Sequence, residues 1–385
     1  MDFSIPADLK EELKRFDKFI KAEIASNLPE WNREHAIPRR FFQLAGKQGW
    51  YGYRWKDGRM IKHSGLRETL ILERVATVSP GVAVAVLIVS DLGLTALSCF
   101  GSKEQKSLYG AAAVSGDCLI CFGNTENLAG SDAAGIKMTA KKTTGGWILN
   151  GAKAYTTNAL VSDLVVVTAV TDPDAHRNRR ISMFLVDLNT SGISRIKLNK
   201  RVWIPSDLTR IDFDDVHVPD DCLLGKIGHG LQQTLTVFTN SRIPISGIAL
   251  GTAAGAFDLA VQRAKSRKVF GKSIAEFQTK AFEIADHYAR MEAARLMVYR
   301  AAVAMDSGGE YRFEASLAKY LSVKMAKQLC PWAADLFGAA SVIYEHPIHK
   351  FPVDAWAVSL AEGTQDVQKL VIFRELMKSR LYRSE

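Results

Sequence analysis

The chain has 385 residues, more than one ordinary hydrophobic core accommodates, so its length favours two or three domains. Hydrophobic residues make up 47% and charged residues 24%, a balance that excludes wholesale disorder and a collagen-like or linker-dominated protein. The net charge of +9 favours acidic partners such as nucleic acid, an acidic carrier protein or a phosphorylated cofactor. Because the basic residues are dispersed and do not alternate with aromatic residues, we expect no binding to nucleic acid.

Several patterns that would indicate secretion, membrane insertion or metal binding are missing. The first residues lack a basic segment followed by an apolar one, and the longest apolar stretch (81–89) is too short to cross a bilayer. The five cysteines are odd in number and unevenly spaced, as expected of reduced thiols. His346 and His349 flank a proline and have no third ligand nearby. We therefore expect a soluble cytoplasmic protein without a metal site.

The first region, residues 1–117, has a helical pattern. Apolar residues recur at helical spacing near the start, and residues 66–78 and 82–99 continue in the same way. Ser102 stands where an N-cap begins a further helix. This region is predicted to be an N-terminal helical domain.

The second region, residues 118–223, has a strand pattern. Short runs rich in β-branched and aromatic residues alternate with turn signals such as Gly145-Gly146 and Asn150-Gly151. The runs cover residues 147–149, 164–170, 182–186 and 209–213. This region is predicted to be a middle antiparallel β-domain.

The third region, residues 224–385, is predicted to be a C-terminal four-helix bundle, which makes the fold class α+β. No proline occurs between Pro244 and Pro331, so long uninterrupted helices are possible. Gly247, Gly251 and Gly255 lie four residues apart and form one smooth stripe on a helix. Either another helix or a cofactor can approach such a stripe closely, and tight helix packing is at least as good an interpretation.

Four motifs in a fixed order carry the functional signal. They are residues 122–132 (FGNTENLAGSD), 151–158 (GAKAYTTN), 267–274 (RKVFGKSI) and 362–366 (EGTQD). Neither a phosphate-binding GxxxxGK[ST] loop nor a strand–GxGxxG–helix unit is present. With this motif order and these three regions, the sequence resembles the acyl-CoA dehydrogenase family of flavoproteins along nearly its whole length.

The resemblance implies FAD as the cofactor. A flavin needs hydrogen bonds at its ring edge, a wall against one face and charge compensation at its pyrophosphate. Tyr155 stands where the family has a tryptophan and would stack on the ring, and the Arg267 guanidinium suits the diphosphate. Phe270 and Gln278 match residues that serve the neighbouring subunit's cofactor, which implies a homodimer or homotetramer. The implied FAD-binding residues are Phe122, Asn124, Thr125, Ser131, Tyr155, Thr157, Arg267, Phe270, Gln278, Gly338, Thr364 and Asp366.

Glu362 is the candidate catalytic residue. Gly363 permits an unusual backbone angle after it, and Thr364 can cap the helix that follows. In the family this glutamate removes the α-proton of an acyl thioester, and burial beside a flavin would raise its proton affinity toward neutrality. A structural anion before a helix N-terminus is the alternative interpretation.

Two further residues are candidates for substrate binding. Arg242 matches a family arginine near the pantetheine, although Thr239 replaces its usual aspartate partner. Asp91 lies on the helix that lines the acyl pocket in the family, where it could face a polar acyl chain. An N-cap or solvent-facing role for Asp91 is an open alternative.

We predict an FAD-dependent dehydrogenase that desaturates an acyl thioester between its α and β carbons. The thioester would be carried by CoA or by an acyl-carrier protein, and an electron-transfer flavoprotein is a possible acceptor. A flavin-dependent monooxygenase on the same fold, or a non-catalytic flavin-binding protein, are the alternatives.

Overall fold

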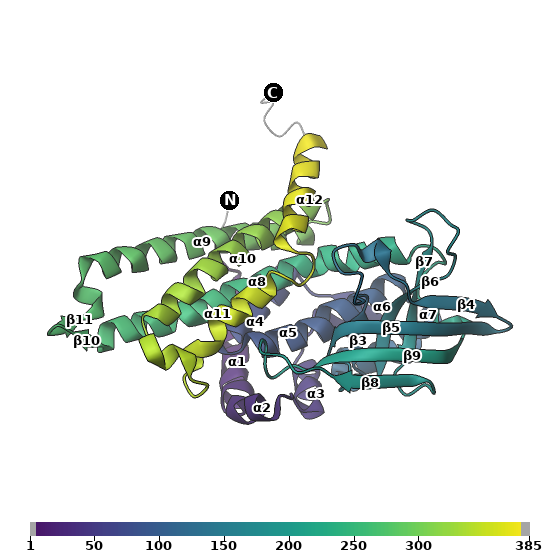
Figure 1. Ribbon diagram of the computed structural model, residues 1–385, viewed down its shortest axis with the longest axis horizontal. Helices are drawn as coiled ribbons and strands as arrows, with labels where there is room; N and C mark the ends of the chain where they lie inside the picture. Colours follow the sequence, from purple (N-terminus) through teal and green to yellow (C-terminus); the bar gives the residue numbers. More distant parts are fainter. Residues whose placement is uncertain (1–4, 379–385) are drawn as a thin grey trace.

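The computed structural model describes residues 5–378. Helices, a β-sheet and a second set of helices follow one another along the chain. Figure 1 shows the sheet at one end of the long axis and the small hairpin β10–β11 (Lys268–Val269 and Lys272–Ser273) at the other end. The long C-terminal helices connect these two ends.

The N-terminal region is mainly helical, as the sequence predicts. Ser102 accepts a hydrogen bond from the Gln105 backbone, and the Gln105 side chain bonds the Ser102 backbone in return, so this capping box starts the last helix of the region. The helices are α1 (Ala7–Phe19), α2 (Leu28–Glu34), α3 (Arg39–Lys47), α4 (Gly65–Val78), α5 (Pro80–Leu87), α6 (Leu94–Phe100) and α7 (Lys103–Ser115), with π-helical turns at Ile20–Ala25 and Ile88–Gly93.

The sequence patterns did not predict one element of this region, a short β-hairpin. Strands β1 (Tyr53–Lys56) and β2 (Arg59–Lys62) form an antiparallel hairpin between α3 and α4. Its two-residue turn, Asp57-Gly58, has positive φ at both positions (51° and 72°). Asp-Gly is among the strongest short hairpin signals because this turn needs positive φ twice.

The middle region is a seven-stranded sheet in the order β3-β6-β4-β5-β9-β8, with β7 paired to β6. Its strands are β3 (Ile120–Gly123), β4 (Thr139–Thr143), β5 (Gly146–Thr157), β6 (Leu164–Val170), β7 (Ile181–Asp187), β8 (Ile193–Lys197) and β9 (Leu208–Pro219). Most neighbours pair antiparallel, as predicted, but β6 runs parallel to both β3 and β4. Strand β6 is buried along its whole length, which explains its continuous apolar sequence.

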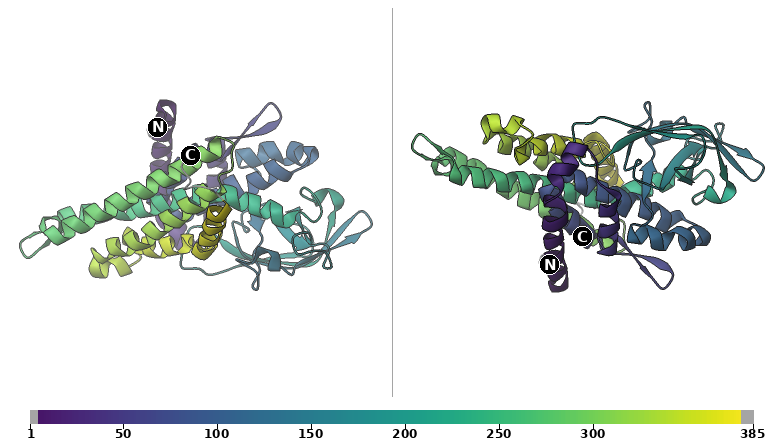
Figure 2. Two further views of the ribbon diagram at one scale, coloured as in Figure 1. Left: turned by 90° about the horizontal axis from the view of Figure 1, so that it is seen from above. Right: turned by 90° about the horizontal axis from the view of Figure 1, so that it is seen from below.

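The C-terminal region consists of α8 (Gly230–Ser266), α9 (Gln278–Asp306), α10 (Arg312–Asp335), α11 (Lys350–Val358) and α12 (Gln365–Lys378). Figure 1 shows α8, α9 and α10 running side by side, with the shorter α11 against them and α12 projecting from the bundle. The two views in Figure 2 show that the hairpin end of this bundle extends well beyond the N-terminal helices.

Two helical stretches, Pro80–Phe100 and Gly230–Ser266, are long and apolar enough to cross a membrane. However, 89% and 83% of their most apolar windows are buried inside the protein. Burial in the core therefore accounts for their composition without a membrane.

The glycine stripe of α8 packs against α4. A Cβ atom on Gly251 would lie 2.0 Å from the Glu73 carbonyl oxygen, and one on Gly255 would lie 2.2 Å from the Thr77 carbonyl oxygen. Of the two interpretations of the stripe, helix packing is the one that the structure supports. The absence of side chains here lets the two helix backbones touch.

The first prediction concerns this contact. Gly251→Ala should lower the free energy of unfolding by about 1–3 kcal/mol, because the new methyl group overlaps backbone that has no room to move. Gly309→Ala is the matched control, since nothing lies within 4 Å of a Cβ at Gly309. Urea midpoints at equal protein and FAD concentrations measure the difference, and equal midpoints for both variants would contradict the packing argument.

Candidate active site

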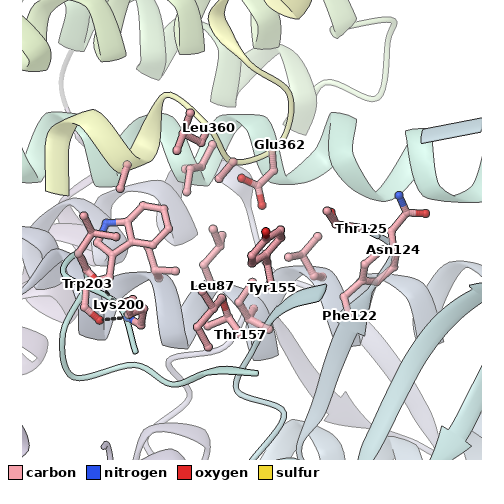
Figure 3. A pocket seen from close by; sticks show the side chains of 18 of the residues that line it. Leu87, Phe122, Asn124, Thr125, Tyr155, Thr157, Lys200, Trp203, Leu360 and Glu362 are labelled. Atoms are coloured by element: carbon pink, nitrogen blue, oxygen red, sulfur yellow. Dashed lines mark hydrogen bonds between the residues drawn. The ribbon is translucent and has the colours of Figure 1, made fainter. Parts of the chain in front are cut away.

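A cavity of about 430 Å³ lies where the three regions meet (Figure 3). The N-terminal helices supply an apolar wall that includes Leu87 and Ile88. The sheet region supplies a mixed wall, and the segment between α11 and α12 supplies Glu362. The residues that line the cavity are Val84, Leu87, Ile88, Leu92, Phe122, Asn124, Thr125, Ala154, Tyr155, Thr157, Lys200, Val202, Trp203, Leu208, Phe238, Ile245, Ala357, Leu360, Ala361 and Glu362.

Six predicted site residues meet in this cavity although three separate segments carry them. They are Phe122, Asn124, Thr125, Tyr155, Thr157 and Glu362. Figure 3 shows the side chain of Glu362 entering the cavity from one side and the ring of Tyr155 entering it from the other. The cavity thus combines polar ring-edge partners, an aromatic ring and one carboxyl group.

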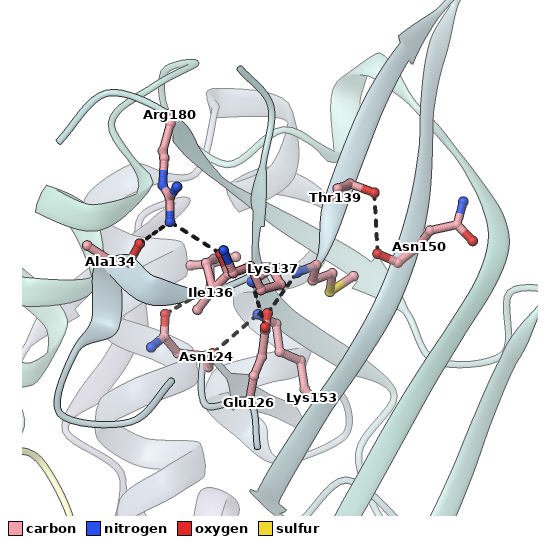
Figure 4. Close-up of polar contacts among 11 residues, drawn as sticks. Asn124, Glu126, Ala134, Ile136, Lys137, Thr139, Asn150, Lys153 and Arg180 are labelled. Atoms are coloured by element: carbon pink, nitrogen blue, oxygen red, sulfur yellow. Dashed lines mark hydrogen bonds and ion pairs between the residues drawn. The ribbon is translucent and has the colours of Figure 1, made fainter. Parts of the chain in front are cut away.

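A buried ion pair holds the polar wall in place (Figure 4). Lys153 is completely buried, and its Nζ lies 2.7 Å from Glu126 Oε1 and 3.2 Å from the Asn124 carbonyl oxygen. The Glu126 carboxylate also accepts hydrogen bonds from the backbone N–H groups of Lys137 and Met138. These contacts fix the segment that carries Asn124 and Thr125.

Tyr155 owes its position to an irregularity in strand β5. The pairing of β5 with β9 shifts register between Lys153 and Thr156, and Tyr155 has a positive φ of 61°. Bulges of this kind redirect side chains and are frequent next to active sites. Tyr155 as a residue is 57% exposed and lines the cavity, so its side chain is accessible to a bound ring.

A second prediction tests the support beneath this wall. Lys153→Met should destabilise the protein by about 3–5 kcal/mol, because it leaves the buried Glu126 carboxylate without its cation. Lys142→Met removes the exposed partner of Asp220 and should change stability by less than about 1 kcal/mol. Urea midpoints provide the comparison, and equal effects of the two substitutions would contradict a structural role for Lys153.

Glu362 occupies a strained turn. Glu362 and Gly363 have positive φ angles of 47° and 92°, and α12 starts two residues later with Thr364 Oγ1 accepting from the Val367 N–H at 3.4 Å. A non-glycine residue with this φ is uncommon and persists only where its surroundings enforce it. The cap at Thr364 is the role that the sequence predicts for it.

The carboxyl group of Glu362 has an unusual environment. The residue as a whole is only partly buried, but Oε2 is fully buried and has no hydrogen-bond partner. Burial raises the pKa of Glu362 to about 7, although the charges of Lys319 and Arg242 act in the opposite direction. A carboxyl group that is free to accept a proton therefore faces the cavity.

Side chains from three helices hold the turn by its carbonyl oxygens. Lys319 of α10 donates to the carbonyls of Ala361 and Gly363. Gln368 of α12 donates to the carbonyls of Glu362 (3.1 Å) and Gly363 (2.9 Å). Arg242 of α8 donates to the Glu362 carbonyl at 3.3 Å.

Arg242, a predicted substrate residue, thus contacts the turn itself. It is buried, and burial together with the nearby Arg312 lowers its pKa to about 10. Its other described contact is a 3.4 Å hydrogen bond to Thr239 Oγ1.

Asp91 lies behind the cavity wall and is not part of the lining. It belongs to the π-helical turn Ile88–Gly93 and is completely buried, so the alternatives of an N-cap or a solvent-facing acid are wrong. Burial, and then the nearby Glu68 carboxylate, raise its pKa well above the usual range. Asp91 Oδ2 is buried and has no partner, while the Thr95 hydroxyl donates to Oδ1 at 3.4 Å.

The remaining predicted residues lie outside the cavity. Ser131 and Asp366 are exposed, and Asp366 forms an ion pair with Lys369 at 3.0 Å. Arg267, Phe270 and Gln278 lie around the β10–β11 hairpin, at the far end of α8 from the sheet (Figure 1). Arg267 directly follows the last residue of α8 and comes 25 residues after Arg242, which is roughly 37 Å along a helix axis. Gly338 follows the end of α10, and Phe270 has a positive φ of 50° with 97% exposure.

Sequence reasoning missed Lys153, Trp203 and Lys319. Trp203 lines the cavity with a positive φ of 50°, its backbone N–H donates to Asp354 Oδ1 at 2.6 Å, and its indole nitrogen is buried without a partner. For Lys319 a signal existed, since it stands in a helix between small residues such as Ala315 and Ser322 that are completely buried.

Comparisons with known proteins identify the family. Residues 7–117, 121–216 and 228–377 match the N-terminal, middle and C-terminal domains of acyl-CoA dehydrogenase. An acyl-CoA dehydrogenase of Bacillus subtilis is 32% identical over 366 residues, covering 93% of this chain and 95% of that protein. The caffeyl-CoA reductase-Etf complex subunit CarC of Acetobacterium woodii is 32% identical and covers 94% and 96%.

Solved structures show the same fold. Butyryl-CoA dehydrogenase from Megasphaera elsdenii has a TM-score of 0.92 at 29% identity, with 98% of this chain and all of that chain covered. The FAD complex of PigA has a TM-score of 0.93 at 26% identity, with 98% and 99% covered. The chain belongs to the acyl-CoA dehydrogenase family and is an FAD-dependent oxidoreductase that acts on CH–CH donors.

Proposed function

We propose that this enzyme desaturates an acyl thioester and that Glu362 is the base that removes the α-proton. The observation that carries the proposal is the free Oε2 atom of Glu362 in a cavity with otherwise mostly apolar walls. The pKa of about 7 places this carboxyl group near the pH at which general-base catalysis is most effective. The interpretation of Glu362 as a structural anion has less support, because a structural anion would have its hydrogen bonds satisfied.

The residues in the cavity fit the flavin ring of FAD. Asn124, Thr125 and Thr157 offer polar atoms along one wall, Tyr155 offers an open aromatic face, and the unpartnered indole N–H of Trp203 needs an acceptor. When bound, FAD supplies the hydride acceptor for the β-hydrogen of the substrate. The chain's own share of the chemistry is to exclude water with its apolar walls and to accept the α-proton on Glu362.

The thioester oxygen needs a hydrogen-bond donor while negative charge develops on it. Within the described residues, the backbone N–H of Glu362 has no hydrogen-bond partner, and it belongs to the turn 361–363, whose carbonyls Lys319, Gln368 and Arg242 hold. We assign this N–H to the thioester oxygen, and we propose that Arg242 and Asp91, which do not line the cavity themselves, support the substrate site from behind its wall. The carrier of the acyl group is CoA in the family, and an acyl-carrier protein is the alternative source of the same pantetheine thioester.

A second copy of the chain would complete the cofactor site. Arg267, Phe270, Gln278 and Gly338 lie too far along the bundle to reach the cavity of their own chain. They lie near a surface hollow of about 600 Å³ that Phe270 helps to line. We therefore propose a soluble, cytoplasmic homodimer or homotetramer in which this end of each bundle contacts the partner's FAD, with Ser131 and Asp366 as further contacts.

The reduced flavin needs an electron acceptor that reoxidises it. The relative from Acetobacterium woodii is a subunit of a complex with an electron-transfer flavoprotein. We propose an electron-transfer flavoprotein as the acceptor that reoxidises this enzyme.

The third prediction tests the base. Glu362→Gln should slow flavin reduction by a thioester roughly 10²–10⁴-fold, because the amide cannot accept a proton, while FAD content stays unchanged. Anaerobic bleaching of the flavin by a panel of acyl-CoA and acyl-carrier-protein thioesters measures the rate. Glu104→Gln, which changes an exposed acid at the start of α7, is the control and should behave as the parent does.

The outcomes separate the candidate functions. Reduction at the parent rate by Glu362→Gln would transfer the base role to another acid, with Asp91 first. A parent enzyme that no thioester reduces, but that consumes oxygen with an external reductant, would favour the monooxygenase. A protein that binds FAD and does neither would be the non-catalytic member.

The fourth prediction tests the shared cofactor site. Arg267→Ala should lose most of its FAD, because the FAD diphosphate would then lack the guanidinium cation that we propose pairs with it. Arg15→Ala, an exposed arginine on α1, should retain its FAD. Flavin absorbance per chain after gel filtration gives the occupancy, and sedimentation gives the mass. A flavin-loaded monomer of the parent protein would contradict the shared site.

A further inference from the structure

Lys319 is a completely buried lysine that no part of the reaction requires as a reactant. It lies on α10, and its Nζ donates to the carbonyl oxygens of Ala361 and Gly363, the two residues that flank Glu362. Burying an ammonium group is costly unless acceptors compensate it. The acceptors here are the backbone of the turn that carries the proposed base.

The contact is specific because the turn is strained. The positive φ angles of Glu362 and Gly363 turn successive peptide groups out of a helical arrangement. Among the residues that the structure describes, no backbone N–H donates to the carbonyls of Ala361, Glu362 or Gly363. One lysine that bridges the first and third carbonyl of the turn restrains both residues at once. Gln368 and Arg242 hold the carbonyl between them.

We propose that Lys319 is a positioning residue for Glu362: it locks the left-handed turn through the two flanking carbonyls and places one positive charge behind the carboxyl group. The proposal rests on the function proposed above for Glu362. Within the described part of the chain, the hydrogen bonds of Lys319 Nζ go to the carbonyl oxygens of Ala361 and Gly363, so we infer that it acts through Glu362 and not on a reacting atom.

The charge of Lys319 has a consequence with a defined sign. It lowers the pKa of Glu362, against the effect of burial, and burial lowers the pKa of Lys319 itself to about 7. Among the described residues, the other charged groups that act on Glu362 are Arg242 on α8 and Asp91 in the π-helical turn. Removing the lysine charge therefore raises the pKa of Glu362 and moves the onset of base catalysis to higher pH.

Three substitutions separate the two roles of Lys319. Lys319→Met removes both the charge and the hydrogen bonds, Lys319→Gln keeps donor groups on a shorter neutral side chain, and Lys319→Arg keeps the charge. Lys327→Met is the control, since Lys327 lies on the exposed face of the same helix. Purified FAD-loaded enzymes are compared after their melting temperatures have shown which variants fold.

The first readout is the pH profile of flavin reduction by a thioester that reduces the parent. The rising limb should move up by roughly 1–3 pH units in the Met and Gln variants and stay in place in the Arg and control variants. Lys319→Met should also reduce the plateau rate about 10²-fold, as expected of a misplaced catalytic group, and Lys319→Gln should reduce it less. Parent profiles and rates in both neutral variants would overturn the proposal.

The second readout needs no substrate, so it tests the Lys319 proposal even if the proposed function is wrong. Infrared difference spectra over a pH titration should contain a carboxylic-acid carbonyl band that disappears in Glu362→Gln. The midpoint of this band should rise in Lys319→Met, or in Lys319→Gln if the Met variant does not fold. If no thioester reduces the parent, the function is wrong but the infrared midpoint still decides on Lys319; an unchanged midpoint overturns the Lys319 proposal alone.

Discussion

The backbone contact between α4 and α8 fixes the N-terminal region against the C-terminal region, and the rest of the cavity is built around it. Glycines at every fourth residue of α8 bring its backbone against the carbonyls of α4, so the two helices have little freedom to slide or rotate. Helix α8 also packs on α9, α10 and α11 and touches the sheet. It carries Phe238 and Ile245 to the cavity and Arg242 to the carbonyl of Glu362. A cavity whose walls come from three regions keeps its shape only if such a contact holds them together.

Much of this architecture follows from local sequence patterns. The helix–sheet–helix order could be predicted because one-sided burial gives helices and strands different hydrophobic periods. Strand β6 could be predicted from its continuous apolar run, and the helix start at Ser102 from its capping residue. The parallel pairing of β6 could not, since pairing direction depends on which strands meet in space. The hairpin turn at Asp57-Gly58 was detectable in principle, but its flanking strands are only four residues long and lie within a helical region.

The residues of the candidate site also fall into those that the sequence predicted and those that it did not. Motifs singled out the segments that carry Glu362, Thr125 and Tyr155, and the structure brings those segments to one cavity. Lys153 lies within the motif 151–158 and Lys319 stands between small residues, but neither sign identified a supporting role, because a lysine is expected at the surface until its partners are known. Both Lys153 and Lys319 donate to backbone carbonyls of segments that carry cavity residues, and these carbonyls lie 29 or more residues away in the chain.

Binding the backbone rather than the carboxyl group solves a conflict inherent in a buried base. A cation bonded directly to the Glu362 carboxylate would stabilise its charge but would occupy the atom that we propose accepts the proton. No cation at all would leave the carboxyl group protonated near neutral pH because of its burial. Cations that bond to the adjacent carbonyls lie close enough to lower the pKa while Oε2 stays free. The strained turn makes this possible, because it exposes three consecutive carbonyl oxygens to side chains from α8, α10 and α12.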